Sequence, residues 1–161
     1  YNYKHRESST DYIMVVVTVK IKKYYIDNYE KEEIFDTIKN ILIGLPEIIF
    51  AYVHGSFMEQ TAFGDIDLAV YLKKEDLNEQ IVKYEIELEI KLEENIKYPL
   101  DVRVLNHAPL SFQYHVIKSG VLLFEKDMDS RVEFQTKTLD FYFDFAPFRK
   151  QYLEGVLDFG D

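Results

Sequence analysis

The spacing of apolar residues along the chain switches between the periods of strands and helices. Over residues 15–22 apolar and polar side chains alternate in part, which is typical of a strand with one face in water. From residue 34 to residue 45 the apolar side chains recur at helical spacing, and Gly44 and Pro46 provide a stop signal. The segment 47–54 is rich in isoleucine, valine and aromatic residues, which favours a strand.

The rest of the chain continues this mixture of elements. Residues 75–96 fit both a helical stripe and a strand-like alternation, but their length and their many glutamates and lysines favour a helix. The other segments are predicted as strands over 65–72, 100–105 and 121–124, a short helix over 109–119, a long helix over 128–143 and a further helix from Pro147 toward Leu157. This order predicts a single α/β or α+β domain.

Composition narrows the class of protein. At 161 residues the chain has the length of one domain, and 47% hydrophobic residues can form a core. It has 19 lysines and arginines against 29 acids, a formal charge of −10, which argues against a broad surface for duplex nucleic acid. A nucleotide is still compatible with this charge, because Mg²⁺ can bridge acidic side chains to phosphates.

Location and membrane attachment follow from two absences in the sequence. The chain contains no cysteine, so we expect no disulfide, no thiolate metal site and a reducing, cytoplasmic location. The longest apolar stretch, residues 12–19, is far short of the ~20 residues of a membrane span. No small-residue cleavage pattern follows it, so neither a membrane anchor nor a secretory signal is expected.

Two aspartates in the predicted strand 65–72 offer the ligands that a divalent metal needs. Residues two apart on a strand project to one face, so Asp65 and Asp67 would point the same way with α-carbons roughly 6.5–7 Å apart. Two unpaired carboxylates this close would repel each other, and a metal removes that penalty. Asp101, in the strand predicted over 100–105, could supply a third carboxylate if the two strands are neighbours. The three aspartates are therefore a candidate Mg²⁺ site for phosphoryl-type chemistry.

Gly55 and Ser56 stand where the strand 47–54 is predicted to end, and eight residues separate Ser56 from Asp65. Glycine lets a phosphate approach the backbone closely, serine offers a hydroxyl, and exposed amides at a helix start favour anions. Taken alone, Asp-x-Asp is most often a solvated turn or a strand end, and Gly-Ser carries little information. The joint order of strand, Gly-Ser, short gap, Asp-Ile-Asp and a later strand aspartate is far more specific for phosphoryl transfer.

The spacing of the four histidines does not indicate a role in this site. They are His5, His54, His107 and His115. None shows the paired spacing of a metal site, and each is expected to be structural or exposed. His54 adjoins Gly55, but a packing role is the favoured interpretation. A Ser56 nucleophile is not supported, because no recognisable motif places a histidine base.

The motif resembles the nucleotidyltransferase superfamily typified by DNA polymerase beta, and more closely its small single-domain branch, the minimal nucleotidyltransferases. The shared pattern is a Gly-Ser, a gap, an Asp-x-Asp and a later aspartate on a neighbouring strand. In this chain the pattern falls on Gly55, Ser56, Asp65, Asp67 and Asp101. Residues 131–147 are also similar to the C-terminal helical tail of that branch.

The resemblance covers about residues 28–157 and implies a division of the chain. Residues 28–161 would form the nucleotidyltransferase domain with its C-terminal helical tail, and residues 1–27 an N-terminal extension that could add an edge strand. The implied fold is α+β, with a small mixed β-sheet and helices packed on it. The implied ligands are Mg²⁺ in a two-metal site and a nucleoside triphosphate, usually ATP.

Site roles and a partner also follow from the resemblance. Gly55 and Ser56 would bind phosphate, and Asp65 and Asp67 would bind metal. Asp101 would complete the catalytic set, either as a metal ligand or as acceptor of the proton of the attacking hydroxyl. Small members of the branch are often antitoxins paired with a helical HEPN-type ribonuclease, and some transfer AMP to a tyrosine of that partner. The resemblance thus implies a protein adenylyltransferase of a toxin–antitoxin system.

One departure from the family pattern keeps alternatives open. No basic residue lies between Ser56 and Asp65, where many relatives carry an arginine, although Lys73, Lys74 or Arg103 could meet the phosphate charge. A second hypothesis is a catalytically weak or inactive antitoxin that neutralises its partner by contact alone. Its aromatic C-terminal region could make that contact, although most of that region is expected to be core. A third hypothesis is a small-molecule nucleotidyltransferase whose site is shared across a homo-oligomer.

Overall fold

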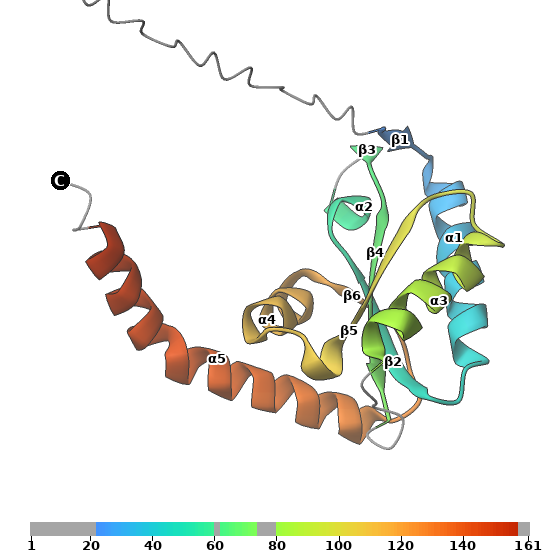
Figure 1. Ribbon diagram of the computed structural model, residues 1–161. Helices are drawn as coiled ribbons and strands as arrows, with labels where there is room; N and C mark the ends of the chain where they lie inside the picture. Colours follow the sequence, from blue (N-terminus) through green and yellow to red (C-terminus); the bar gives the residue numbers. More distant parts are fainter. Residues whose placement is uncertain (1–21, 60–61, 74–79, 158–161) are drawn as a thin grey trace, which may run out of the picture.

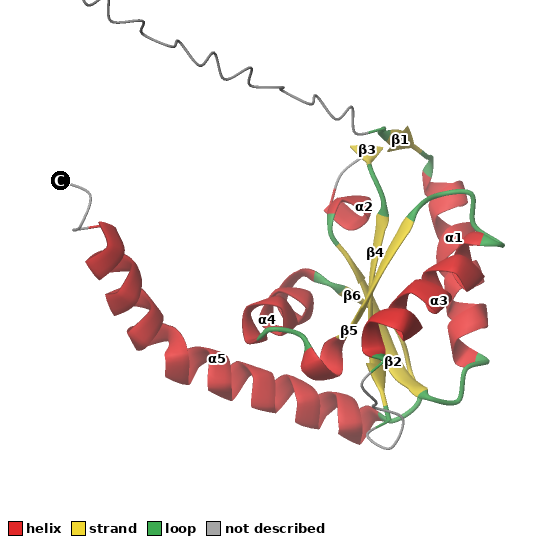
Figure 2. Ribbon diagram, in the orientation of Figure 1, coloured by secondary structure: helices red, strands yellow, loops and turns green. Residues whose placement is uncertain are grey.

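A four-stranded mixed β-sheet forms the centre of the domain (Figures 1 and 2). The computed structural model describes residues 22–59, 62–73 and 80–157. The strands of the sheet are β2 (Ile48–His54), β4 (Ile66–Leu72), β5 (Leu100–Val104) and β6 (Val121–Glu125). Their order is β5-β4-β2-β6, with β4 and β5 parallel and the other neighbours antiparallel. The expected α+β fold with a small mixed sheet is confirmed.

Helices cover both faces of this sheet. They are α1 (Asn28–Ile43), α2 (Ser56–Glu59), α3 (Ile81–Glu93), α4 (Leu110–Ser119) and α5 (Met128–Leu157), with the 3-10 helix η2 (Leu105–His107). One face of the sheet packs against α1 and α3 through side chains such as Ala51 and Val53. The other face packs against α4 and the first part of α5 through Phe50 and Tyr52. β2 is buried along its whole length because it is covered on both faces and paired on both sides.

Helix α1 shows how local sequence sets one of these elements. The side chain of Asp27 accepts a hydrogen bond from the Glu30 amide at 2.8 Å, which satisfies one of the free N–H groups at the helix start. Ile34, Ile38 and Leu42, four residues apart, form the buried stripe. The predicted helix over 34–45 is therefore confirmed, with a start six residues earlier.

The edge strand β5 is closed off by carboxylates of α3. Glutamates 85, 89 and 93 lie one turn apart on α3. Their Oε1 atoms accept hydrogen bonds from the amides of Val104, Val102 and Leu100 at 2.8, 2.9 and 3.0 Å. These amides face away from β4, so the three glutamates occupy the positions that a further strand would use. The ambiguous segment 75–96, of which residues 80–96 are described, thus contains a helix over Ile81–Glu93.

Two short strands form a second, two-stranded sheet near the start of the described chain. β1 (Tyr24–Tyr25) pairs antiparallel with β3 (Ala62–Phe63). This pairing lies outside the four-stranded sheet and joins the residues before α1 to the loop that precedes β4. The strand predicted over residues 15–22 lies outside the described residues, apart from Lys22.

The C-terminal helix differs from its prediction at Pro147. The sequence predicts one helix over 128–143 and another from Pro147, but α5 runs without interruption from Met128 to Leu157. A proline removes one backbone hydrogen bond and crowds the carbonyl four residues earlier, and this can bend a helix without ending it. Figure 1 shows α5 curving in its C-terminal half.

Much of α5 is solvent-exposed, contrary to the expectation that its aromatic residues are core. Phe134 is buried and packs on Phe50 and Tyr71, with ring centroids 5.6 and 5.1 Å apart. Farther along the helix, the rings of Phe141, Phe143, Phe145, Phe148 and Tyr152 are all more than half exposed. The helix continues past the edge of the domain (Figure 1), which leaves these rings largely in solvent, although Phe143 contacts the ring of Tyr114 on α4 at a centroid distance of 6.0 Å.

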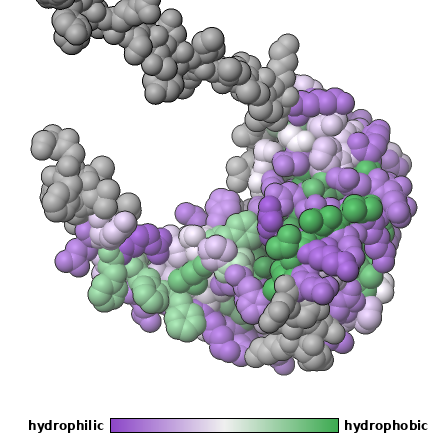
Figure 3. Space-filling model, viewed as in Figure 1, coloured by the Kyte–Doolittle hydropathy of each residue, from purple (hydrophilic) through white to green (hydrophobic). Residues whose placement is uncertain are grey.

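Apolar side chains also gather on the outside of α3. Val82, Ile86 and Ile90, four residues apart, are 67%, 49% and 56% exposed. Figure 3 shows apolar residues both along α5 and over the body of the domain at α3. Among the helices that the structure describes, none is both long and apolar enough to cross a bilayer.

Candidate active site

Asp65, Asp67 and Asp101 converge at one end of the sheet. A carboxylate oxygen of each lies within 4.8 Å of those of the other two, and all three residues are partly buried. Asp65 immediately precedes β4, Asp67 is the second residue of β4, and Asp101 is the second residue of β5. Asp67 is directly opposite Asp101 in the parallel pairing of these strands, so the register brings the third carboxylate to the first two.

The three carboxylates destabilise one another in their charged form. Burial, followed by the charges of Asp65 and Asp101, raises the pKa of Asp67 from 3.8 to about 6. The nearby His115 acts in the opposite direction. An added cation would relieve this repulsion, which is the electrostatic signature of a metal site.

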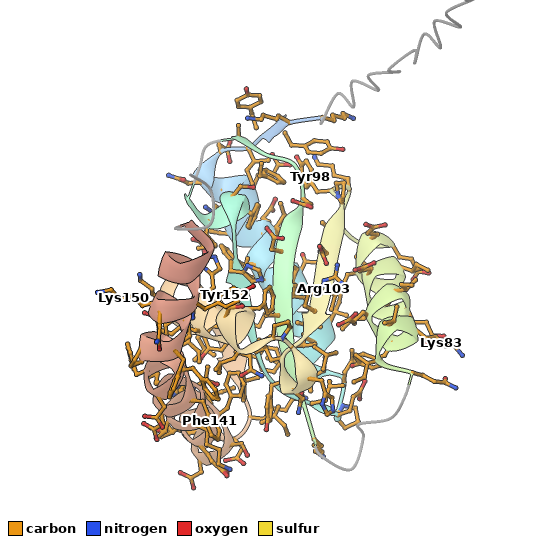
Figure 4. All side chains as sticks on the ribbon, turned by 60° about the vertical axis from the view of Figure 1, so that its left-hand side comes forward. Lys83, Tyr98, Arg103, Phe141, Lys150 and Tyr152 are labelled. Carbon is orange, nitrogen blue, oxygen red and sulfur yellow. The ribbon has the colours of Figure 1, made fainter. Side chains whose placement is uncertain are left out.

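Arg103 is the cation nearest to this cluster within the sheet. Its Nε lies 3.0 Å from Oδ1 of Asp101, and its Nη1 lies 3.6 Å from Oε2 of the buried Glu85 on α3 (Figure 4). Its Nη2 donates a weak hydrogen bond of 3.4 Å to Oδ2 of Asp101. Arg103 is thus held between two carboxylates of its own protein.

Lys73, which was also considered for the phosphates, does not reach the cluster. Lys73 follows the last residue of β4, whereas Asp65 precedes the first, and a seven-residue strand spans roughly 20 Å. The expectation for Lys73 was therefore wrong, because the two residues lie at opposite ends of one strand. Lys74 lies outside the described residues.

Gly55 is fitted to the Asp67 side chain. It has a φ of 72°, in the left-handed region that residues with a side chain rarely adopt. A Cβ atom at this position would also overlap Oδ2 and Cγ of Asp67. Only glycine therefore lets the chain leave β2 here while the Asp67 carboxylate keeps its place.

His54 is packed beside the cluster. It lies opposite Asp67 in the β2–β4 pairing and contacts the ring of Phe112 on α4, with centroids 5.4 Å apart. Burial, and then the charge of His115, lowers the pKa of His54. Its Nε2 is buried and has no hydrogen-bond partner among the described residues. The ring is therefore held mainly by packing.

A cavity of about 520 Å³ opens beside Asp65 and Ser56. Its volume lies within the range of ~300–1,000 Å³ that is typical of small-molecule sites. Gly64 and Pro99 contribute to its wall, and so do Lys22 and Lys23 from the segment before β1. The two lysines were missed by sequence analysis, because no local pattern indicates that residues so far from Ser56 in the chain reach it.

The donor set of the cluster fits a hard divalent cation such as Mg²⁺. Three carboxylates offer only oxygen ligands, which Mg²⁺ prefers over nitrogen or sulfur. Oδ1 of Asp101 is buried and accepts no well-aligned hydrogen bond from any residue that the structure describes, although the Arg103 guanidinium lies 3.0 Å from it, so a metal would compete with Arg103 for this oxygen. Elsewhere in the described ranges, no second group of three or more potential metal ligands occurs.

Several solved structures share this fold. A chain of a toxin–antitoxin complex with AMP-PNP has a TM-score of 0.65 and 24% identity, over 76% of this chain and 98% of that chain. A chain of the tri-AMPylated Shewanella oneidensis HEPN toxin in complex with MNT antitoxin has a TM-score of 0.64 and 23% identity, over 79% and 98%. A chain of the MntA–HepT toxin–antitoxin complex has a TM-score of 0.59 and 21% identity, over 81% and 99%.

Sequence comparison adds the family. No curated protein matches the chain at a significant level. The model of the polymerase beta nucleotidyltransferase family matches residues 36–129, more than half of the chain, and this range contains Gly55, Ser56 and all three aspartates. The chain therefore belongs to the polymerase beta nucleotidyltransferase family.

Proposed function

We propose that this protein is a Mg²⁺-dependent nucleotidyltransferase that moves AMP from ATP to a tyrosine hydroxyl of a HEPN-type toxin and thereby acts as its antitoxin. The observation that carries the proposal is the convergence of Asp65, Asp67 and Asp101 within 4.8 Å beside Gly55 and Ser56. Membership of the nucleotidyltransferase family supports the reaction type. Such a reaction needs cellular ATP and Mg²⁺, so we place the protein in the cytoplasm.

The similar structures support the choice of partner and nucleotide. One is a toxin–antitoxin complex with AMP-PNP, an ATP analogue, and another pairs an MNT antitoxin with a HEPN toxin that carries AMP groups. This chain covers 98% of the matched chain in both cases. The shared fold therefore extends over the whole of the matched chains, which favours the same kind of partnership here.

Each residue of the site has a chemical task in this proposal. Asp65 and Asp67 hold the metal, which when bound supplies positive charge to the triphosphate. The tyrosine oxygen forms a bond to the α-phosphorus while the bond to the bridging oxygen of the β-phosphate breaks, and pyrophosphate leaves. Asp101 ligates the metal or accepts the proton of the tyrosine hydroxyl. Gly55 and Ser56 bind phosphate at the turn from β2 into α2.

Labelling with the cognate toxin tests the activity. The chain is incubated with Mg²⁺, ATP labelled on the α-phosphate and the HEPN-type protein encoded beside it. We expect label on a toxin tyrosine, and none with ATP labelled on the γ-phosphate, because AMP rather than phosphate is transferred. EDTA and Asp67→Asn should each reduce transfer by at least a hundred-fold, as expected for lost charge stabilisation at the phosphates. Near-normal transfer by Asp67→Asn would contradict its role.

Contact without catalysis is the second candidate function, and the exposed rings of α5 favour it. Phe141, Phe145, Phe148 and Tyr152 recur at helical spacing along one side of α5, with the exposed Phe143 on another side, and exposed apolar side chains gathered in this way often mark a protein-binding site. This surface lies on the helix that also packs against the sheet face bearing the aspartates. A partner bound to it would reach the active site from that side.

The two candidates differ in what happens when the aspartates are removed. A variant with Asp65, Asp67 and Asp101 all changed to asparagine keeps the α5 surface. Full protection of cells from the toxin by this variant would support contact alone and contradict neutralisation by transfer. Loss of protection, with unchanged binding to the toxin, would support transfer.

A further inference from the structure

The active site carries more negative charge than the metal and Arg103 can balance. Three aspartates and the roughly four charges of a triphosphate exceed the four positive charges of two Mg²⁺ ions by about three. Arg103 is already held by Asp101 and Glu85. The loop between Ser56 and Asp65 contains no lysine or arginine. Tight binding of a triphosphate therefore requires a cation from another part of the chain.

The β1–β3 pairing brings two such cations to the site. In its antiparallel register Tyr24 is opposite Phe63, so the register continued past the paired residues places Lys23 opposite Gly64 and Lys22 opposite Asp65. Opposed residues of antiparallel strands have α-carbons about 4.5–5.5 Å apart. Both lysines accordingly line the cavity of about 520 Å³ that also contains Ser56 and Asp65.

An aromatic cluster holds the segment that carries these lysines. The rings of Tyr24, Phe63 and Tyr98 contact one another, with centroids 5.1 to 5.8 Å apart. Phe63 and Tyr98 are buried, and the Tyr98 hydroxyl donates a hydrogen bond of 2.7 Å to Glu30 on α1. Figure 4 shows Tyr98 at the same end of the sheet as β1. The residue after Lys23 is thus anchored to the domain rather than carried on a free tail.

Lys22 and Lys23 are also chemically available. Both are exposed, and neither forms an ion pair with any residue that the structure describes. The neighbouring Lys97, by contrast, is paired with Glu30 at 2.9 Å. Lys31 lies near α2, but its Nζ is within hydrogen-bond distance of the Met58 carbonyl and over the ring of Phe57. Lys22 Nζ lies over the ring of Tyr24, 4.9 Å from its centroid, a contact that leaves its N–H donors free. Unlike Lys31 and Lys97, the two lysines that line the cavity have no acidic or carbonyl partner among the described residues.

We propose that Lys22 and Lys23 bind the β- and γ-phosphates of the nucleotide and replace the basic residue that is absent between Ser56 and Asp65. The assignment rests on the proposed nucleotidyltransferase function and adds the residues that hold its substrate. Ammonium groups are common phosphate ligands. A lysine strengthens binding through charge-assisted hydrogen bonds, and because its ammonium group acts as a point charge it does not need one fixed orientation. The segment before α1 is then part of the active site, which extends the site beyond the matched range 36–129.

Calorimetric titration with a non-hydrolysable ATP analogue and Mg²⁺ tests this assignment without relying on turnover. We expect Lys22→Ala/Lys23→Ala to weaken binding of the analogue roughly ten- to a hundred-fold, the range for loss of charge-assisted hydrogen bonds. Binding of AMP should change less than three-fold, because AMP lacks the β- and γ-phosphates. Lys22→Arg/Lys23→Arg should bind the analogue within a few-fold of the unmodified chain.

A matched control removes two lysines elsewhere. Lys83→Ala/Lys91→Ala lowers the net charge by the same amount as Lys22→Ala/Lys23→Ala, but on the exposed side of α3. Figure 4 shows Lys83 on the opposite side of the sheet from α5. It should leave binding of both nucleotides unchanged, which separates a local contact from a general charge effect. Thermal unfolding of each variant shows whether the domain remains folded.

The outcomes separate this assignment from the proposed function. If the unmodified chain binds neither nucleotide, the nucleotidyltransferase proposal fails. If it binds the analogue and the double alanine variant binds it equally well, the lysine assignment alone is overturned. Equal weakening of the ATP analogue and AMP would also overturn it, because the contact would not involve the β- and γ-phosphates.

Discussion

A methyl group on Gly55 would occupy the space of the Asp67 carboxylate. Asp67 lies opposite His54, the last residue of β2, and Gly55 follows His54 with a φ of 72°. The glycine of the Gly-Ser pair and the second aspartate of the Asp-x-Asp pair are therefore one packed unit. Their distance in sequence hides this contact, but the antiparallel register creates it.

Gly55→Ala should damage both stability and metal binding. The left-handed backbone alone costs a residue with a side chain about 1–3 kcal/mol, and the overlap with Asp67 must be relieved by moving that carboxylate. We expect a lower urea midpoint and loss of the stabilisation that Mg²⁺ confers on the unmodified chain. Urea unfolding with and without Mg²⁺ measures both effects.

Gly44→Ala is the control for that substitution. Gly44 has a φ of −69°, which suits alanine, and the nearest atom to a new Cβ is a backbone oxygen at 3.3 Å. It should change the free energy of unfolding by less than about 1 kcal/mol and leave Mg²⁺ binding intact. Equal effects of the two substitutions would contradict a specific role for Gly55.

The raised pKa of Asp67 predicts how the metal-free protein responds to pH. A folded-state pKa of about 6 against an ordinary value of 3.8 means that the native state holds the proton more tightly. The contribution of Asp67 to stability therefore falls as the pH rises from about 4 to about 6. Asp67→Asn, which stays neutral, should be more stable than the unmodified chain at pH 7.5, with the difference vanishing near pH 4.

Bound Mg²⁺ should offset the loss of stability with rising pH in the unmodified chain. Mg²⁺ binds the ionised carboxylates, so its stabilising effect should grow as the pH rises through 6 and should be weak at pH 5. Thermal unfolding with and without Mg²⁺ at pH 5.0 and 7.5 gives the comparison. Asp36→Asn, a substitution at an exposed position, is the control. Its stabilisation by Mg²⁺ should depend on pH as that of the unmodified chain does. A metal effect that is independent of pH would contradict the assignment of Asp67.

The glutamates of α3 should stabilise the edge of the sheet. Glu85→Ala leaves the buried amide of Val104 without its acceptor, which costs about 1–3 kcal/mol. Glu87→Ala on the exposed side of the same helix removes only a surface ion pair with Lys83 and should cost less than about 1 kcal/mol. Urea unfolding of the two variants tests the difference.

Removing all three glutamates should also expose β5 to strand addition. The triple variant Glu85→Ala/Glu89→Ala/Glu93→Ala frees three amides at the sheet edge, and unpaired edges promote association. Size-exclusion chromatography should show larger species than for a triple variant on exposed positions. An unchanged elution profile would mean that packing of α3, rather than its carboxylates, protects the edge.

The exposed rings of α5 should contribute to toxin binding. Phe145→Ser/Phe148→Ser removes two rings that are 57% and 68% exposed, so the unfolding free energy should change by less than about 1 kcal/mol. Affinity for the toxin should fall at least ten-fold if the rings are buried at the interface. Val82→Ser/Ile86→Ser on the apolar surface of α3 is the comparison and should retain affinity. The reverse result would move the partner surface to α3.

Local sequence determined most of the elements of this protein. The four-residue spacing of Ile34, Ile38 and Leu42 and the cap at Asp27 specify α1 without reference to the rest of the chain. The i, i+2 spacing of Asp65 and Asp67 and the Gly-Ser at the end of a β-rich segment likewise identify the site. Periodicity and backbone preference act over a few residues, so they can be read from the sequence alone.

Only the tertiary structure decided which of these elements meet. Pairing of β4 with β5 joins Asp101 to the other aspartates, and pairing of β1 with β3 brings Lys22 and Lys23 to Asp65. The exposure of the α5 rings likewise depends on where the helix leaves the domain, so their aromatic composition suggested core instead. Strand register and helix docking are set by contacts between distant segments, and a single sequence carries no local signal for them.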